Sequence, residues 1–382
     1  MTKSVCAECG ATVPTQPLRT ISLEFSAGPP GAPKSIAGSM SAVVAFGRYL
    51  WVCGDQTATV ELLAADDASR PTVYRHHRSF RLGELVTLPQ DGETEIDLEG
   101  ADLQLDGNTG QLWLIGSHSW ARDRIKPDDA RKDAIKKLRQ VSLDLNRRCL
   151  IRIPVVVGAD GVPELVPVAP GPRQVEAGLL TELADEIALD RHLGAFVSIP
   201  GKDNGVDVEG LAVVGKRIFV GLRGPVLRGW AVILELGVEE GDALGVSGTR
   251  LRLRRDEDGH PFRKHFLELG LGIRDLSVEG DDLVILAGPT MLLDGPVRLL
   301  RWKDGAVANE SMVVRADDPD LTIMHELPYG TGDEAGKDHP EGFTRLVDGD
   351  GSTFLVVYDS PAASRLSHHE EHVTADVFPR TP

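Results

Sequence analysis

One short phrase recurs at wide intervals along this 382-residue chain: an acidic residue, a glycine, an apolar stretch, a turn and a second apolar stretch. The clearest copies begin at Asp97-Leu98-Glu99-Gly100, Asp207-Val208-Glu209-Gly210 and His339-Pro340-Glu341-Gly342. Each copy continues as a hairpin pattern of two apolar segments around a turn. Repetition of a hairpin unit at this scale is typical of a modular all-β fold.

Alignment of the turn glycines extends the pattern to five repeats, near residues 41, 99, 209, 274 and 341. The acidic position of the phrase is then occupied by Ser41, Glu99, Glu209, Arg274 and Glu341. Two repeats therefore lack the carboxylate, and one of them carries a positive charge instead. A purely structural position would have less reason to change charge, so this variation marks a candidate site.

Later strands are predicted at residues 230–236 and 249–254 in the middle repeat and at residues 297–302 in the fourth. Four strands per repeat is the blade of a β-propeller. We therefore predict an all-β protein, a β-propeller of five or six four-stranded blades, in which a sixth blade would be a degenerate repeat between residues 150 and 200. The 41 Gly and 24 Pro suit many short strands joined by tight turns.

The propeller is expected to be a single domain over residues 18–382, preceded by a flexible leader over residues 1–17 in which prolines block regular structure. Residues 19–26 alternate apolar and polar side chains, as an isolated strand does, and in a closed ring this strand would complete the final blade. Two short helical inserts are predicted, over residues 127–138 and 175–189, as packing or lid elements on one face of the disc.

The formal net charge of −17 repels phosphate backbones and anionic lipids, so neither nucleic acid nor a membrane is expected as a partner. No apolar stretch is long enough to span a bilayer, and we expect a cytoplasmic protein. Cys6 and Cys9 have the spacing of half a zinc knuckle, but no second pair follows nearby, which favours a frayed, reduced tail over a zinc site.

The first strand of each blade runs along the central channel of a propeller, so the repeat starts should converge at one mouth. Glu99, Glu209, Glu341 and Arg274 are therefore predicted neighbours. Crowded carboxylates need a compensating cation. A hard divalent cation such as calcium, bound by Glu99, Glu209 and Glu341, would supply it, and so would the Arg274 guanidinium. A third interpretation is that each carboxylate only caps backbone amides of the next blade.

Other candidate residues lie on loops at the same mouth. The glycine-flanked loop before the middle phrase offers a cluster suited to a polar ligand, and strand ends elsewhere carry one polar side chain each. No nucleophilic serine lies on a strand-to-helix elbow, and no catalytic residue is assigned. The full set of candidate ligand-binding residues is Glu99, His118, Lys202, Asp203, Asn204, Asp207, Glu209, Arg223, Arg274, His339, Glu341 and Asp359.

Several of these phrases together resemble a known bacterial family. They are Gly116-Ser-His-Ser119, Gly201-Lys-Asp-Asn-Gly205 with Val208-Glu-Gly-Leu211, Gly221-Leu-Arg-Gly-Pro225 with Gly229-Trp-Ala231, Ala287-Gly-Pro-Thr290, and His339-Pro-Glu-Gly342 with Val357-Tyr-Asp359. The family is the one catalogued as domain of unknown function 3616 (DUF3616), and the resemblance runs from about Ser39 to Pro361.

The Glu-Gly strand starts also resemble those of phytase-like and esterase-like propellers, which implies a disc with a polar central site. The calcium ring and histidines of phytate hydrolysis have no residue-by-residue match here, because Ser41 and Arg274 interrupt the ring. The expected function is binding of a small polar molecule or a protein partner at the channel mouth. The alternatives are a metal-assisted phosphoester or ester hydrolase that uses Glu99, Glu209 and Glu341, and a purely structural interaction platform.

Overall fold

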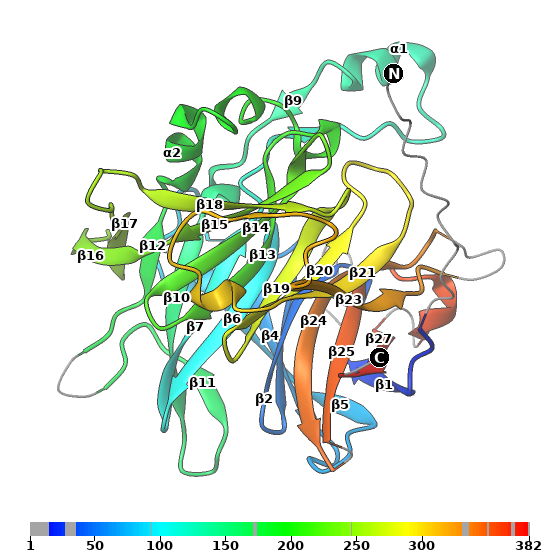
Figure 1. Cartoon of the computed structure of the whole chain (residues 1–382). Coiled ribbons are helices and arrows are strands. Elements are labelled where there is room, and N and C mark those ends of the chain that lie inside the picture. The colour runs from blue at the N-terminus through cyan, green and yellow to red at the C-terminus, as the bar shows by residue number, and fades with distance from the viewer. Residues whose placement is uncertain are drawn as a thin grey trace.

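The computed structural model describes residues 15–26, 36–92, 94–170, 174–245, 247–330, 336–349, 351–367 and 371–380. Most of these residues lie in strands, with two short α-helices, which confirms the predicted all-β class (Figure 1). Cys6 and Cys9 and most of the predicted leader lie outside the described residues. No described helix has both the length and the apolar character needed to cross a bilayer.

Each of the five predicted repeats begins with an antiparallel strand pair. The pairs are β2 (Met40–Phe46) with β3 (Tyr49–Gly54), β6 (Leu98–Asp106) with β7 (Thr109–Gly116), β13 (Asp207–Val214) with β14 (Arg217–Leu227), β19 (Gly272–Glu279) with β20 (Asp282–Gly288), and β24 (His339–Asp348) with β25 (Gly351–Asp359). The first strands contact one another in the cyclic order β2, β6, β13, β19, β24 and back to β2. This closed order brings segments far apart in the sequence side by side.

The sheet that contains β2 also contains both ends of the described chain. Its order is β2, β3, β4 (Thr59–Ala65), β5 (Val73–Arg81), β1 (Arg19–Glu24), β27 (His372–Pro379), β25 and β24, with β26 (Leu366–Ser367) also paired to β27. Strand β1 pairs antiparallel with β27 and parallel with β5. The prediction that residues 19–26 form a strand completing the last repeat is thus confirmed, and the strand also joins that repeat to the first.

The second sheet has strands from three separate parts of the chain. Its order is β16 (Val238–Ala243), β17 (Thr249–Leu253), β12 (Gly178–Leu180), β10 (Leu150–Val157), β7 and β6, with β11 (Pro163–Leu165) on β10. The strands between residues 150 and 200 therefore extend the second repeat. The assignment of residues 249–254 to the middle repeat was wrong, because β17 pairs with β12 in this sheet.

The other two large sheets are simpler. They have the orders β13, β14, β15 (Trp230–Leu236), β18 (Phe262–Glu268), β22 (Val313–Val314) and β19, β20, β21 (Val297–Trp302), β23 (Leu321–Leu327). Apolar side chains of neighbouring sheets fill the space between them, as in the cluster that joins Ile115 of β7 to Val208 and Leu211 of β13. Burial of these side chains is the main contribution to the stability of the assembly.

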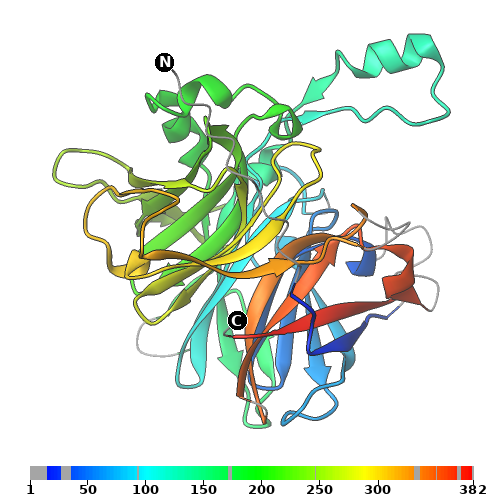
Figure 2. The ribbon, with the colours of Figure 1, turned by 45° about the vertical axis from the view of Figure 1, so that its right-hand side comes forward.

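Both helices are shorter than predicted. Helix α1 covers Arg131–Lys137, and α2 covers Leu183–Leu189. Residues 178–180 form β12 instead of helix because β10 and β17 pair with them on either side. Helix α2 buries Leu183 and Ile187 and is a packing element, whereas α1 buries no side chain. Helix α1 belongs to an arm that projects from the body, anchored by the pairing of β8 (Ala121–Arg122) with β9 (Val141–Ser142) (Figure 2).

Candidate functional site

The aligned acidic positions are β-bulges. In each first hairpin the strand register shifts by one residue near the start of the first strand. The residue without a partner is Ser41, Glu99, Glu209, Arg274 or Glu341, and all of these are buried. A bulge leaves one residue outside the ladder and redirects its side chain. The repeat therefore positions five equivalent side chains, while their chemistry differs.

Glycines beside the bulges let the first strands approach one another closely. A Cβ on Gly100 would lie 2.8 Å from Leu211 Cβ, and one on Gly210 would lie 2.9 Å from Leu276 Cγ. Both distances are shorter than ordinary van der Waals contact, so only glycine fits at either position. This close packing brings the bulge side chains of different repeats within reach of one another.

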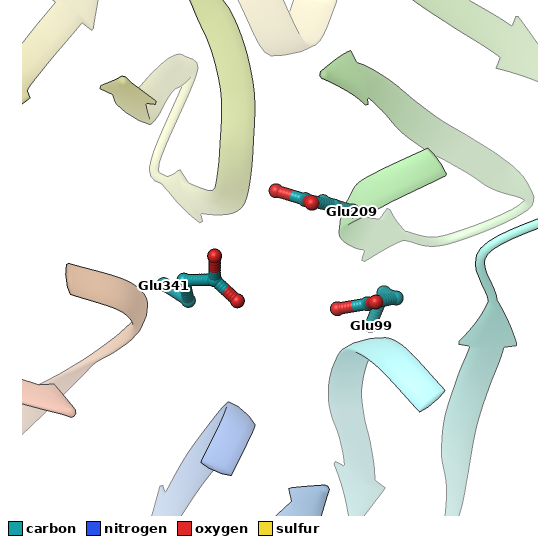
Figure 3. Close-up of side chains that lie close together, drawn as sticks. All are labelled: Glu99, Glu209 and Glu341. Atoms are coloured by element: carbon teal, nitrogen blue, oxygen red, sulfur yellow. The ribbon is translucent and has the colours of Figure 1, made fainter. Parts of the chain in front are cut away.

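Three carboxyl groups meet at this point. One oxygen each from Glu99, Glu209 and Glu341 lies within 4.8 Å of the others. Figure 3 shows the three side chains extending toward one another from three separate strands. The structure thus brings together residues that are more than a hundred positions apart in sequence, as the repeat alignment predicts.

Arg274, the bulge residue of β19, lies between two of these carboxylates. Its Nη1 atom is 3.2 Å from Glu209 Oε2 and also donates to Glu341 Oε1. Its Nη2 atom donates to the Pro289 carbonyl at 2.9 Å. The guanidinium therefore supplies the positive charge that a bound cation would otherwise supply to Glu209 and Glu341.

Arg223, within β14, is the second guanidinium of the site. Its Nη1 atom lies 2.6 Å from Glu209 Oε1 and 3.7 Å from Asp207 Oδ2. Burial opposes ionisation of Glu209, but Arg223 and Arg274 outweigh it and lower the Glu209 pKa. Burial dominates at Asp207 and raises its pKa to about 6. Glu209 is thus the firmly ionised member of the group.

Glu99 differs from the other carboxylates because no cation pairs with it. It is buried and makes no hydrogen bond or ion pair within the described part of the chain. Burial, together with the negative charges of Asp97, Glu209 and Glu341, raises the Glu99 pKa well above its ordinary value. The nearby charge of Lys202 opposes this shift only in part, so the site favours the protonated form of Glu99 more than water does.

Lys202 is the third cation near these carboxylates. It follows Gly201 in a short 3-10 turn, and its side chain keeps solvent contact although protein groups surround its ammonium. Burial and Arg223 favour the neutral amine, but Asp207, Glu209 and Glu341 outweigh them and raise the Lys202 pKa. Lys202 is thus a charged group that solvent can reach at the edge of a buried cluster.

Two of the loop candidates make structural contacts instead. Asp203 is exposed and forms an ion pair with Arg122, with Nη2 and Oδ2 2.7 Å apart. Asn204 has a left-handed backbone, with φ of 71°, and its Oδ1 accepts from Val226 N at 3.5 Å. These contacts hold the turn that carries Lys202.

The remaining candidates lie around the cluster. His118 is buried, its Nδ1 lies 2.8 Å from the Gly116 carbonyl, and burial lowers its pKa to about 4. No contact joins His118 to the three glutamates within the described residues. His339 lines a small cavity together with Arg274, and it pairs with Asp359 in the strand register.

Sequence reasoning missed one residue of the cluster, Asp97. Asp97 has a left-handed backbone, with φ of 56°, and its Oδ2 lies 2.9 Å from Arg147 Nη1. Its charge contributes to the raised pKa of Glu99. The sequence could have indicated this residue, because Asp97 is the first residue of its copy of the repeated phrase, in the position that Asp207 holds in the middle copy.

The residues fit a hard cation only in part. Three carboxylates within 4.8 Å of one another are the oxygen donors that calcium prefers. However, Arg274 Nη1 already bonds to two of them. A divalent ion at this position would have to displace the guanidinium.

A family model described as "Protein of unknown function (DUF3616)" matches residues 39–376. The chain belongs to this family. The match spans all five bulge residues and includes every candidate ligand-binding residue. The resemblance inferred from the repeated phrases is thus confirmed. No curated protein matches this DUF3616 chain.

Solved structures show only loose similarity to this DUF3616 member. An exo-β-1,3-galactanase from Clostridium thermocellum has a TM-score of 0.42 at 9% identity, over 93% of this chain and 61% of the galactanase chain. A Trypanosoma rangeli sialidase mutant displaying trans-sialidase activity has a TM-score of 0.33 at 7% identity, over 89% of this chain and 54% of that one. The DUF3616 chain therefore spans less than two thirds of either protein. These scores are too low to establish a common fold.

Proposed function

We propose that this chain is a five-bladed β-propeller, a single domain over residues 18–382, whose central site binds a small polar ligand. The cyclic contacts of the five first strands support the blade count, since each first strand is the inner edge of its own repeat. The parallel pairing of β1 with β5 supports a closed ring. In this architecture the five bulge side chains point toward the axis, where a ligand would enter.

The observation that carries the proposal is the unpaired Glu99 beside solvent-accessible Lys202. Arg223 pairs with Asp207 and Glu209, and Arg274 pairs with Glu209 and Glu341. Glu99 forms no ion pair within the described residues, and the charge of Lys202 acts on it without direct contact. A carboxyl group whose pKa is raised and an ammonium together suit a compact ligand that offers a hydrogen-bond acceptor and an anionic group.

This proposal is tested by ligand-induced stabilisation. The wild-type chain would be melted in the presence of glucose, glycerate, inorganic phosphate or calcium chloride, beside Lys202→Ala and Glu99→Gln. A ligand at one hundred times its dissociation constant stabilises a protein by about 2.7 kcal/mol. We expect glycerate or phosphate to raise the wild-type melting temperature, and both variants to lose most of that shift.

Arg78→Ala is the matched control, since Arg78 pairs with Glu164 on the surface away from the first strands. Arg78→Ala should respond to the ligand as the wild type does. Equal shifts in wild type, Lys202→Ala and Glu99→Gln would place binding elsewhere and contradict the proposal. Stabilisation by none of the small molecules would instead favour a protein-docking platform.

The second candidate is a metal-assisted phosphoester or ester hydrolase. The close approach of the three glutamate oxygens favours it. A metal there would polarise the substrate and activate water. This candidate requires calcium or another divalent ion to stabilise the wild-type chain and a chelator to reverse the effect. Its test is the same melting experiment in calcium chloride, with Glu341→Gln as the variant that removes one ligand.

A further inference from the structure

The arm, defined as residues 121–142, is an ordered projection without any buried residue. Every one of these residues is at least partly exposed. The four large apolar side chains of the arm are among them: Ile125 is 41% exposed, Ile135 46%, Leu138 51% and Val141 37%. Figure 2 shows the arm extending away from the sheets. Isolated apolar residues are common on surfaces, but four on one projection indicate an interaction site.

The arm is held in shape by polar contacts of its own. Lys137 Nζ lies 2.7 Å from Asp129 Oδ2, and Lys126 N donates to the same carboxylate at 2.6 Å. The short strands β8 and β9 pair at its base. A seven-residue helix such as α1 gains little stability on its own in water. These contacts preserve the shape of the arm, and a partner would bury its apolar face.

The arm also differs in charge from the rest of the chain. It contains eight Lys or Arg and four Asp, a net charge of +4, whereas the whole chain has −17, which leaves −21 for the remainder. A surface that complements the arm should therefore be apolar and acidic. The remainder of the chain supplies acidic surface in excess.

A second exposed apolar patch lies at the same end of the molecule. Leu292 and Leu293 are 81% and 58% exposed, and acidic Asp294 follows them. Arg223 donates to the carbonyl of Met291, which places this loop beside the central site. The base of the arm lies near the same site, because Arg122 pairs with Asp203, which follows Lys202 in the sequence.

From these features we infer that two copies of this chain associate through this end, with the arm of each copy docked on the Leu292–Leu293 loop of the other. A two-fold axis makes both contacts at once, because one copy provides an arm and a loop to its twin. The apolar side chains would be buried in both contacts, and the basic arm would meet Asp294. An anionic membrane fits less well, since the net charge of −17 repels it. This inference does not depend on the proposed ligand.

Sedimentation equilibrium of the full chain tests the association. We expect the wild type to be a dimer, and Ile135→Asp/Leu138→Asp and Leu292→Asp/Leu293→Asp each to raise the dissociation constant at least about tenfold. Val347→Asp is the control, because Val347 is 70% exposed near the turn between β24 and β25, at the end of β24 away from its bulge. The control should remain dimeric. Near-ultraviolet circular dichroism and melting temperatures establish that each variant is folded.

A mixing experiment identifies the partners in the contact. The arm variant keeps an intact loop, and the loop variant keeps an intact arm. A mixed dimer therefore recovers one of its two contacts, and an equimolar mixture should associate more tightly than either variant alone. No recovery on mixing would overturn the arm-to-loop assignment. A wild type that stays monomeric at all concentrations would overturn the inference, and so would a monomer whose arm binds anionic phosphatidylserine vesicles.

Discussion

Arg274 Nη1 lies 3.2 Å from Glu209 Oε2, so a guanidinium from one first strand is paired with a carboxylate from the adjacent first strand. The Arg274 and Glu209 side chains are 7% and 2% exposed. Burial of both charges carries a large desolvation cost, which this pair offsets together with the pairs of Arg223 with Glu209 and of Arg274 with Glu341. The ion pair therefore joins two repeats, and the relative position of these repeats depends on the charges of the site.

Arg274→Ala should lower the free energy of unfolding by about 3–5 kcal/mol, because it leaves buried Glu341 without its paired cation and Glu209 with Arg223 alone. Urea unfolding at neutral pH measures the change. Arg78→Ala removes an exposed pair with Glu164 and should cost less than about 1 kcal/mol. Equal losses in the two variants would show that the Arg274 pair contributes no more than a surface pair.

Glu99→Gln should stabilise the protein at neutral pH and change little near pH 4. The folded-state pKa of Glu99 is raised, so the folded form binds a proton that the unfolded form releases. The stability of the wild type should then decline as the pH rises from the ordinary glutamate value through the folded pKa, by about 1.4 kcal/mol per unit of pKa shift. Glutamine does not titrate, so Glu99→Gln should lack this decline in stability with rising pH.

The measurement is the difference in unfolding free energy between wild type and Glu99→Gln from pH 4 to pH 8. The difference cancels other titrating groups, including Asp207, whose pKa is raised to about 6. A difference that stays constant with pH would contradict a raised Glu99 pKa.

Calcium should stabilise Arg274→Ala more than it stabilises the wild type. Removal of the guanidinium leaves three glutamate oxygens within 4.8 Å of one another and free to bind a cation. At one hundred times the dissociation constant the gain would be about 2.7 kcal/mol, read as a shift in melting temperature. Adding Glu341→Gln to Arg274→Ala should abolish the gain. A larger calcium-induced rise in melting temperature for the wild type than for Arg274→Ala would favour the hydrolase candidate instead.

Gly100→Ala should destabilise the protein by about 1–3 kcal/mol, because the new methyl group would meet Leu211 Cβ at 2.8 Å and the Glu209 carbonyl oxygen at 3.0 Å. Thermal unfolding measures the loss. Gly38→Ala is the control, since a Cβ there has no heavy atom within 4 Å. Equal stability of the two variants would mean that the first strands can move apart without cost.

The repeat alignment predicted the equivalent positions because hairpin turns fix strand register. Gly47, Gly215 and Gly280 all have positive φ, between 55° and 65°, and each closes a short turn that fixes the distance to the bulge. Local spacing along the chain was therefore enough to align residues from separate repeats.

Other features depend on contacts that no local pattern encodes. The alternation in residues 249–253 indicates a strand, but it does not say that the strand pairs with β12 across the boundary between repeats. Spacing in residues 175–189 suggested one helix, and strand pairing overrode its first part. Glu99 lacks an ion pair because Arg223 and Arg274 both pair with Glu209 instead. This choice of partner depends on the packing of the strands and cannot be read from the sequence.

Strand β1, near the start of the chain, lies between β27 and β5. During synthesis on a ribosome β1 is made before β27, which follows more than three hundred positions later. Throughout that interval the edge of β1 that pairs with β27 is unpaired, and another nascent chain could bind it. We therefore expect slow ring closure and a demand for chaperones during translation, both set by the long separation of β1 from β27 in the sequence.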